Sequence, residues 1–485
     1  MLSCTSGDTP AAHIGCLCHR PEIRSLTGRI NGDLSRRGFV AGMAASVATL
    51  GFGSRARAQA AGAAPPPPIL FTNFRLFDGK SSSLQDGFRL LVDGSQVKSL
   101  VQGDLAAPEG GRTVDCSGRV IMPGLIDAHW HSLFAALPIQ VLMSADVGYI
   151  FLAASAEAER TLMRGFTTIR DCGGPAFALK QAIDDGLTPG PRIYPSGAMI
   201  TTSGGHGDLR PLSDLPRSLG GPVSVTEQIG GGALADSAAE VQLRAREQLL
   251  QGASQLKMVG GGGVSSPRSP LDMSTFSESD LRAAVEVARD WNTYVTVHAY
   301  ASNTVQRAIA AGAACIEHAH LMDDETARMM ADKGIWLSIQ PFLGADDSVP
   351  LTGPSQAKMQ QVFAATDSAY ELAKKHRIKT AFGSDLLFSG TLTARQGTML
   401  THLTRWYGNA EILTMATATN AELLGLSSLR NPYPGRIGVI EEGAFADLLL
   451  VDGDPLADIA LVADPDKNFV MIMKDGKIYK DKISA

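Results

Sequence analysis

The chain has 485 residues, and its 44% hydrophobic and 19% charged residues are typical of an ordinary soluble protein with a sizeable core. The formal net charge of −6 excludes the basic footprint of a nucleic-acid-binding protein, so we expect no nucleic-acid partner. Beyond residue 60 no stretch is long and apolar enough to span a bilayer, so we expect no stable membrane association of the mature chain.

Residues 1–60 are predicted to be a twin-arginine export signal. Ser35-Arg-Arg-Gly-Phe39 places paired arginines before an aromatic residue, and a mildly apolar run over residues 40–52 and a small-residue site at Ala58-Gln-Ala60 follow. A disordered basic tail is the alternative. The export interpretation predicts a mature protein that begins near Ala61, carries a Pro-rich linker over residues 61–68, and is periplasmic or secreted.

The two ends of the mature chain, residues 69–122 and 431–485, show strand-and-turn patterns. Short segments rich in apolar residues end at Asp-Gly turns, such as Asp93-Gly94 in the first region and Asp475-Gly476 in the second. These are β-hairpin signals. Because each region is too small to bury a core alone, we predict that the two combine into one small composite β-sandwich domain.

Residues 123–430 alternate apolar runs with amphipathic helices. The strand candidates are residues 125–128, 167–170, 192–194, 255–259, 294–297, 315–317, 335–339 and 379–382. Capping boxes at Ser237…Glu240 and Ser277…Asp280 predict helices that end near residues 251 and 290. Eight strand–helix units predict an α/β fold of the (β/α)8 TIM-barrel type. A doubly wound open sheet is the alternative, but it would not gather ligands from several strands around one mouth.

His129 and His131 lie one residue apart at the end of the first of these apolar strands. A strand alternates its side chains, so both imidazoles point the same way. Emerging together from the C-terminal end of a buried strand, they can bind one metal ion from the floor of a pocket. Taken alone, the HxH spacing is explained about as well by chance or by a pair of surface histidines.

Four further residues, Lys257, His298, His318 and Asp385, each follow or end an apolar run of their own. A lysine inside an apolar strand is costly unless it is neutralised or paired, so Lys257 is either an edge residue or a desolvated amine. A desolvated amine can react with carbon dioxide to form a carbamate whose oxygens bridge two cations. His298 and His318 then supply neutral imidazoles for the second ion, and Asp385 can both ligate and accept a proton. Viewed singly, each histidine could be a hydrogen-bonded core residue.

With these residues on one chain, the sequence resembles the amidohydrolase superfamily, in its binuclear branch with a carboxylated lysine. The resemblance covers roughly residues 69–480 and is greatest to the prolidase- and imidazolonepropionase-like carboxypeptidases, a group that includes enzymes hydrolysing the amide of ochratoxin A. The stretches that carry it are Gly165-Phe-Thr-Thr-Ile-Arg-Asp-Cys-Gly-Gly174, Thr202-Ser-Gly-Gly-His-Gly-Asp208, His298-Ala-Tyr300 and Ile316-Glu-His318.

The resemblance implies one zinc ion on His129, His131, Lys257 and Asp385, and a second on Lys257, His298 and His318, with other divalent metals as alternatives. It implies hydrolysis of an amide or peptide bond next to a C-terminal amino acid, in a small dipeptide-like or N-acyl amino acid substrate. A hydroxide bridging the two metals would attack, and Asp385 would act as general base and then general acid. A cyclic-amide hydrolase or a mononuclear deaminase of the same superfamily is the alternative. Lys257 weighs against the deaminase, because such deaminases lack the bridging lysine.

Four residues are candidates for substrate binding. His206 lies in a Gly-rich loop, where an ordinary loop histidine is the alternative, and Arg268 lies in the loop after the lysine. Tyr300 follows a histidine ligand by two residues and therefore faces the same mouth. His320 has the same relation to His318 and is expected in the pocket or behind a ligand, with a position in neither as the alternative. Asp171 is expected to orient a ligand or a loop. We also expect a homo-oligomer.

Overall fold

The computed structural model describes residues 67–483. The predicted export signal and all but the last two residues of the predicted linker lie outside the described residues, so both stay predictions. Within residues 67–483, no helix has the length and apolar character that crossing a membrane requires.

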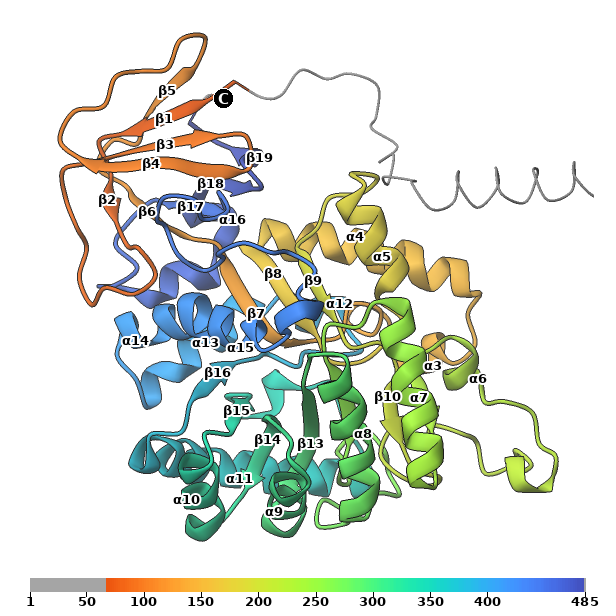
Figure 1. The fold of residues 1–485 in the computed structure, drawn as a ribbon. Helices are drawn as coiled ribbons and strands as arrows, with labels where there is room; N and C mark the ends of the chain where they lie inside the picture. The colour runs from red at the N-terminus through yellow and green to blue at the C-terminus, as the bar shows by residue number, and fades with distance from the viewer. Residues whose placement is uncertain (1–66, 484–485) are drawn as a thin grey trace, which may run out of the picture. The chain divides into compact units, whose positions relative to one another are not determined.

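The two ends of the described chain pair in one five-stranded sheet. Strand β17 (Leu448–Val451) runs antiparallel to β6 (Val120–Pro123). β18 (Phe469–Lys474) and β19 (Lys477–Asp481) extend the sheet on one side, and β2 (Arg75–Leu76) extends it on the other. In Figure 1 the orange strands of the first part and the blue strands of the last part therefore lie side by side.

A second, four-stranded sheet comes from the N-terminal part alone. Its strands are β1 (Ile69–Thr72), β3 (Phe88–Asp93), β4 (Gln96–Gln102) and β5 (Arg112–Asp115), in the order β4-β3-β1-β5. One cluster of buried side chains takes members from both sheets, including Phe71, Leu90, Val114, Leu448 and Met471. Each sheet thus buries an apolar face that it could not bury alone. The predicted domain boundaries at residues 122 and 430 stay predictions.

The eight strands predicted for the central part are confirmed as strands. Three form one parallel sheet: β7 (Leu125–Trp130), β8 (Phe166–Asp171) and β9 (Arg192–Pro195). Five belong to a seven-stranded parallel sheet: β12 (Leu256–Val259), β13 (Val295–Ala301), β14 (Cys315–Leu321), β15 (Trp336–Ile339) and β16 (Thr380–Phe382). The other two strands of that sheet, β10 (Met199–Thr201) and β11 (Gly232–Leu234), are not among the predicted ones.

Contacts join the two parallel sheets. The amide of Asp385, just after β16, donates to the carbonyl of His129 in β7 at 2.9 Å. The amide of Ser254, just before β12, donates to the carbonyl of Pro195 in β9 at 2.7 Å. Both edges of the three-stranded sheet are therefore met by segments that flank the seven-stranded one. Closure of the strands into a (β/α)8 barrel stays a prediction.

Helices follow most central strands. The longer ones are α4 (Val147–Met163), α5 (Phe177–Asp184), α7 (Ala238–Gln251), α8 (Glu278–Asp290), α9 (Ser302–Ala311), α10 (Asp324–Asp332), α11 (Gly353–His376) and α13 (Gln396–His402). The shorter ones are α3 (Ile139–Leu142), α6 (Val225–Gln228), α12 (Gly390–Thr393), α14 (Asn409–Thr414), α15 (Asn420–Gly425) and α16 (Pro465–Asn468).

Both helices predicted from capping boxes are confirmed. The Ser237 side chain accepts a hydrogen bond from the Glu240 amide at the start of α7. At the start of α8, Ser277 and Asp280 cap each other's amides reciprocally. Helix α8 buries Leu281 and its apolar neighbours at helical spacing, which fixes the helix against the parallel strands.

Candidate metal centre

The six residues predicted to bind metal come together around one cavity. His129 lies at the end of β7 and His131 just beyond it, and Lys257, His298 and His318 come from β12, β13 and β14. Asp385 follows β16. All six line the same cavity. Residues from five strands meet there because the carboxyl ends of parallel strands share one edge.

The two histidines of the HxH pair and Asp385 form a first group of ligand atoms. His129 Nε2 and His131 Nε2 are 3.3 Å apart, and each lies 3.4 Å from Asp385 Oδ1. The Nδ1 atoms are occupied elsewhere: His129 donates to Glu317 Oε2 at 2.7 Å, and His131 donates to the carbonyl of Gly173 at 2.8 Å. Both Nε2 lone pairs are therefore left for a ligand in the cavity.

His298 and His318 form a second group. His298 donates from Nε2 to the carbonyl of Gly262 at 2.9 Å, which leaves its Nδ1 free. His318 donates from Nδ1 to Gln340 Oε1 at 2.7 Å, which leaves its Nε2 free. The two rings lie with centroids 4.4 Å apart. Burial lowers the pKa of both rings well below the usual value, so they are neutral, which is the form that binds metal.

Lys257 and Asp385 each bring a buried polar atom without a hydrogen-bond partner. Lys257 is 2% exposed, and its Nζ has no hydrogen-bond partner. Asp385 Oδ1 also has no hydrogen-bond partner. Leaving such atoms unpaired is costly. A lysine that bridges cations as a carbamate and a carboxylate that ligates one of them would remove both costs. Together with the free imidazole nitrogens, this donor set fits a pair of divalent cations.

The backbone is strained at two of the candidate ligands. His318 has a φ of 81° and Asp385 a φ of 50°, both in the left-handed region that non-glycine residues rarely occupy. Ala319, next to the first of them, has a φ of 51°. Each such residue costs on the order of 1–3 kcal/mol, and strain of this kind clusters at functional sites. The strained backbone at these residues therefore lowers the stability of the fold and directs the two side chains into the cavity.

Asp127, which the sequence motifs do not single out, ties the first ligand group together. Its Oδ1 accepts from the amides of His129 and Ser384, both at 3.0 Å, and its Oδ2 accepts from the Ser384 hydroxyl at 2.6 Å. Burial raises the pKa of Asp127 to about 6. The end of β7 is thereby fixed to the turn that carries Asp385. The sequence signal that could identify Asp127 is an acidic residue inside an apolar strand, two residues before His129 and therefore on the same face as both histidines.

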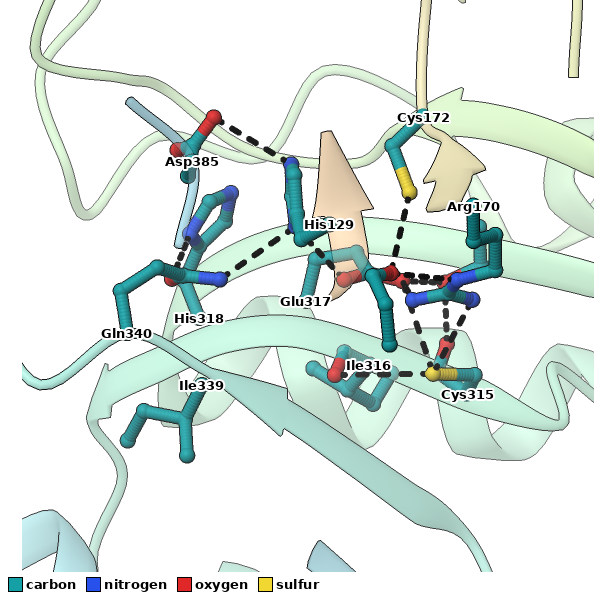
Figure 2. Close-up of polar contacts among 12 residues, drawn as sticks. His129, Arg170, Cys172, Cys315, Ile316, Glu317, His318, Ile339, Gln340 and Asp385 are labelled. Atoms are coloured by element: carbon teal, nitrogen blue, oxygen red, sulfur yellow. Dashed lines mark hydrogen bonds and ion pairs between the residues drawn. The ribbon is translucent and has the colours of Figure 1, made fainter. Parts of the chain in front are cut away.

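Glu317 and Arg170 are also functional candidates that sequence reasoning misses. Glu317 lies between Arg170 and His129, and both side chains of the ion pair are fully buried. In Figure 2 the arginine and two cysteines lie on one side of the glutamate, and His129, His318 and Asp385 lie on the other. Burial by itself would raise the pKa of Glu317, but Arg170 and His129 outweigh it and hold that pKa well below its usual range. The glutamate is therefore an anion.

Two of the predicted substrate-binding residues line the cavity. The His206 ring stacks on the His298 ring with centroids 4.5 Å apart, and its Nδ1 shares a hydrogen bond of 2.9 Å with Ser266 Oγ. Burial lowers the pKa of His206 to about 3, so the ring is neutral. Tyr300 is 4% exposed and also faces the cavity.

The other two lie elsewhere. His320 is buried, binds the carbonyl of Gln340 through Nε2 at 3.0 Å, and does not line the cavity. Arg268 is exposed and lines a neighbouring cavity with Asp208 and Arg210. The structure thus does not bring Arg268 to the candidate ligands, because the loop after β12 carries it outward. Asp171 accepts from the Ser132 amide at 2.7 Å and so orients the loop after the HxH pair.

The wall of the cavity away from the candidate ligands is mostly apolar. It is formed by segments after β7, around β10, after β15 and after β16, with Phe134, Leu142, Met143, Met199, Val349, Leu351, Met359, Phe388 and Leu392 among its residues. Lys257 is the only lysine or arginine among the described residues that line the cavity. The cavity thus joins one polar, ligand-rich end to a large apolar surface.

A family model described as the amidohydrolase family matches residues 120–479. Ochratoxinase from Aspergillus niger is 30% identical over an alignment of 381 residues, and the match covers 74% of this chain and 76% of that protein. A solved amidohydrolase structure is similar with a TM-score of 0.78 at 33% identity, and the similarity covers 85% of this chain and 99% of that chain. A prolidase complexed with N-methylphosphonate-L-proline is similar with a TM-score of 0.78 at 31% identity, covering 85% and 100%. Such relatives imply a TIM barrel with an additional domain.

Proposed function

The chain belongs to the amidohydrolase family, and we propose that it is a binuclear zinc enzyme. We propose further that it cleaves an amide bond next to a C-terminal amino acid. The family and its relatives make it a hydrolytic enzyme that acts on amide bonds. One observation carries the finer proposal: Lys257 Nζ is buried without a hydrogen-bond partner, in a cavity lined by free histidine nitrogens.

The candidate ligands divide into two overlapping sets. One cation would be held by His129, His131, Lys257 and Asp385, and the other by Lys257, His298 and His318. Lys257 would serve both as a carbamate formed with carbon dioxide. When bound, the cations would polarise the scissile carbonyl and lower the pKa of the attacking water.

Asp385 would transfer the proton of the attacking water to the leaving amine. Its Oδ1 faces both Nε2 atoms of the HxH pair at 3.4 Å, while its backbone amide is held by the carbonyl of His129. Anchored in this way, the carboxylate can accept the proton of the attacking water and then deliver it to the nitrogen of the leaving amine. Each of the four histidine ligands has one ring nitrogen committed to a hydrogen bond, which leaves the other to hold a cation.

The cavity suggests which substrates fit. His206 and Tyr300 line the cavity with their rings in contact with the His298 ring, and we propose that they bind the free carboxylate of the amino acid product. The apolar wall would then take up bulky apolar groups of a dipeptide or of an N-acyl amino acid. Ochratoxinase, by its name, acts on ochratoxin, and the similarity to it supports the proposal.

Amidating the substrate carboxylate, or making Tyr300→Phe or His206→Ala, is expected to lower kcat/KM at least tenfold. A hydrogen bond to a charged group contributes roughly 1.5–3 kcal/mol, or about 10- to 150-fold in binding. The measurement is kcat/KM for paired free-acid and amidated N-acyl amino acids, with metal content determined for each variant.

Tyr370→Phe is the matched control, because this buried tyrosine donates to the carbonyl of Ile339 at 3.2 Å and does not line the cavity. It should leave kcat/KM unchanged. Equal cleavage of free-acid and amidated substrates would rule out recognition of a terminal carboxylate.

A cyclic-amide hydrolase or a mononuclear deaminase remains the alternative within the family. A mononuclear site needs no lysine to bridge two cations, so the presence of Lys257 in the cavity favours the binuclear proposal. We also propose that the protein is exported through its twin-arginine segment and that it acts as a homo-oligomer.

A further inference from the structure

A buried arginine–glutamate pair lies directly behind the first histidine ligand. Arg170 on β8 and Glu317 on β14 are in contact at 2.5 Å, and both side chains have no exposed surface. Burying two charges is expensive, and such a pair is often no more stabilising than apolar residues of the same size. Stability alone therefore gives a poor reason for this pair.

The contacts of Glu317 leave neither oxygen unused. Oε1 accepts from Arg170 and from the hydroxyl of Thr296, and Oε2 accepts from His129 Nδ1 at 2.7 Å. Arg170 is itself fixed, because its Nε donates to the carbonyl of Ala128, next to His129 in β7, at 2.5 Å. Three strands thus hold the carboxylate in one position (Figure 2).

A carboxylate paired in this way can only accept, so it requires a proton on His129 Nδ1. A second group competes for the same atom: the amide Nε2 of Gln340 lies 3.3 Å from His129 Nδ1. That amide would favour the opposite tautomer, in which the Nε2 of the histidine is protonated and cannot ligate. The charged contact is the shorter one and the stronger kind, so Glu317 decides the tautomer.

We propose that Glu317, held in place by Arg170, is a positioning residue that keeps His129 in its Nδ1–H tautomer and so leaves Nε2 available for a divalent cation. The proposal rests on the proposed function, because it assumes that His129 is a ligand. The proposal assigns the buried Arg170–Glu317 pair a role at the metal centre, although neither residue lines the cavity or is one of the six candidate ligands.

Glu317→Gln tests the proposal. A carboxamide has one oxygen and one NH2 group, and Arg170 and the Thr296 hydroxyl require the oxygen. The NH2 group would then face His129 and draw the proton to Nε2. Zinc binding, measured on the apoprotein by competition with a chelator, should weaken by about 10- to 100-fold for one of the two ions.

Asp447→Asn is the matched control. Asp447 is also buried and paired with a buried arginine, Arg192, but the pair lies away from the cavity. This variant should lower the melting temperature without changing zinc affinity. If both variants lose affinity equally, or if Glu317→Gln binds two zinc ions as tightly as the wild type, the positioning role is wrong. A wild type that does not bind two zinc ions would instead contradict the proposed function.

A second measurement needs no folded variant at residue 317. The ring nitrogen chemical shifts of 15N-histidine-labelled wild-type apoprotein report the tautomer of each neutral histidine. The His129 signals are assigned as those lost in His129→Asn. They should show a proton on Nδ1, and a proton on Nε2 would overturn the proposal.

Discussion

Lys257→Ala is expected to lower kcat/KM by more than about 100-fold and to reduce the zinc content of the purified protein. Loss of groups that only orient a metal ligand already costs about 10- to 100-fold, and Lys257 is proposed to bridge both cations directly. Without an anionic bridge, two mutually repelling cations would be held by neutral imidazoles and a single carboxylate. The measurements are kcat/KM on an N-acyl amino acid and zinc per chain.

Lys474→Ala is the matched control for this change. Lys474 is also a buried strand lysine, 4% exposed, but it lies in β18 and pairs with Asp475. It should alter stability and leave zinc content unchanged. Adding acetate or propionate should restore part of the activity of Lys257→Ala by supplying a carboxylate at the empty bridge. A Lys257→Ala enzyme with two tightly bound zinc ions and normal turnover would disprove the bridging role.

Gly383→Ala is expected to cause the second large loss, on the order of 100-fold in kcat/KM, because small displacements of reacting groups cost about that much. A Cβ atom at position 383 would lie 2.4 Å from the Cβ and 2.8 Å from the backbone nitrogen of His129. Since backbone atoms cannot rotate away, β7 and the turn that carries Asp385 would have to separate. The change adds no charge and removes no candidate ligand.

Gly425→Ala serves as the control for Gly383→Ala. A Cβ at the end of α15 meets nothing within 4 Å, so this variant should have normal activity and zinc content. The expected signature of Gly383→Ala is a loss of activity together with weakened zinc binding. If it retains wild-type kcat/KM, the close fit between His129 and the Asp385 turn does not matter for function.

The positions of the candidate ligands can be predicted from sequence because strand geometry determines them. An apolar strand fixes where its last side chains emerge, so the HxH spacing by itself places His129 and His131 on one face. The same reasoning brings Lys257 and His298 to one cavity, although they lie within β12 and β13 and not at the ends of these strands. The two helices with capping boxes are predictable because pairs such as Ser277 and Asp280 satisfy each other's amides locally.

The features that sequence cannot predict depend on contacts between distant segments. Strands β10 and β11 have three residues each, too few for a periodic pattern, and they exist because neighbouring strands pair with them. Asp127 binds Ser384, and Glu317 binds His129 and Arg170, all more than a hundred residues away, so only the fold reveals these contacts. Because Arg268 is close to Lys257 in sequence, both are predicted to line the same cavity. The glycine loop between them instead leads Arg268 to the neighbouring cavity.

Zinc titration of the apoprotein, followed by metal content and activity in parallel, tests the central claim most directly. The proposed site predicts two zinc ions per chain, with full amidase activity on an N-acyl amino acid reached only when the second ion is bound. Full activity with a single bound ion, or with none, would contradict the binuclear centre built around Lys257.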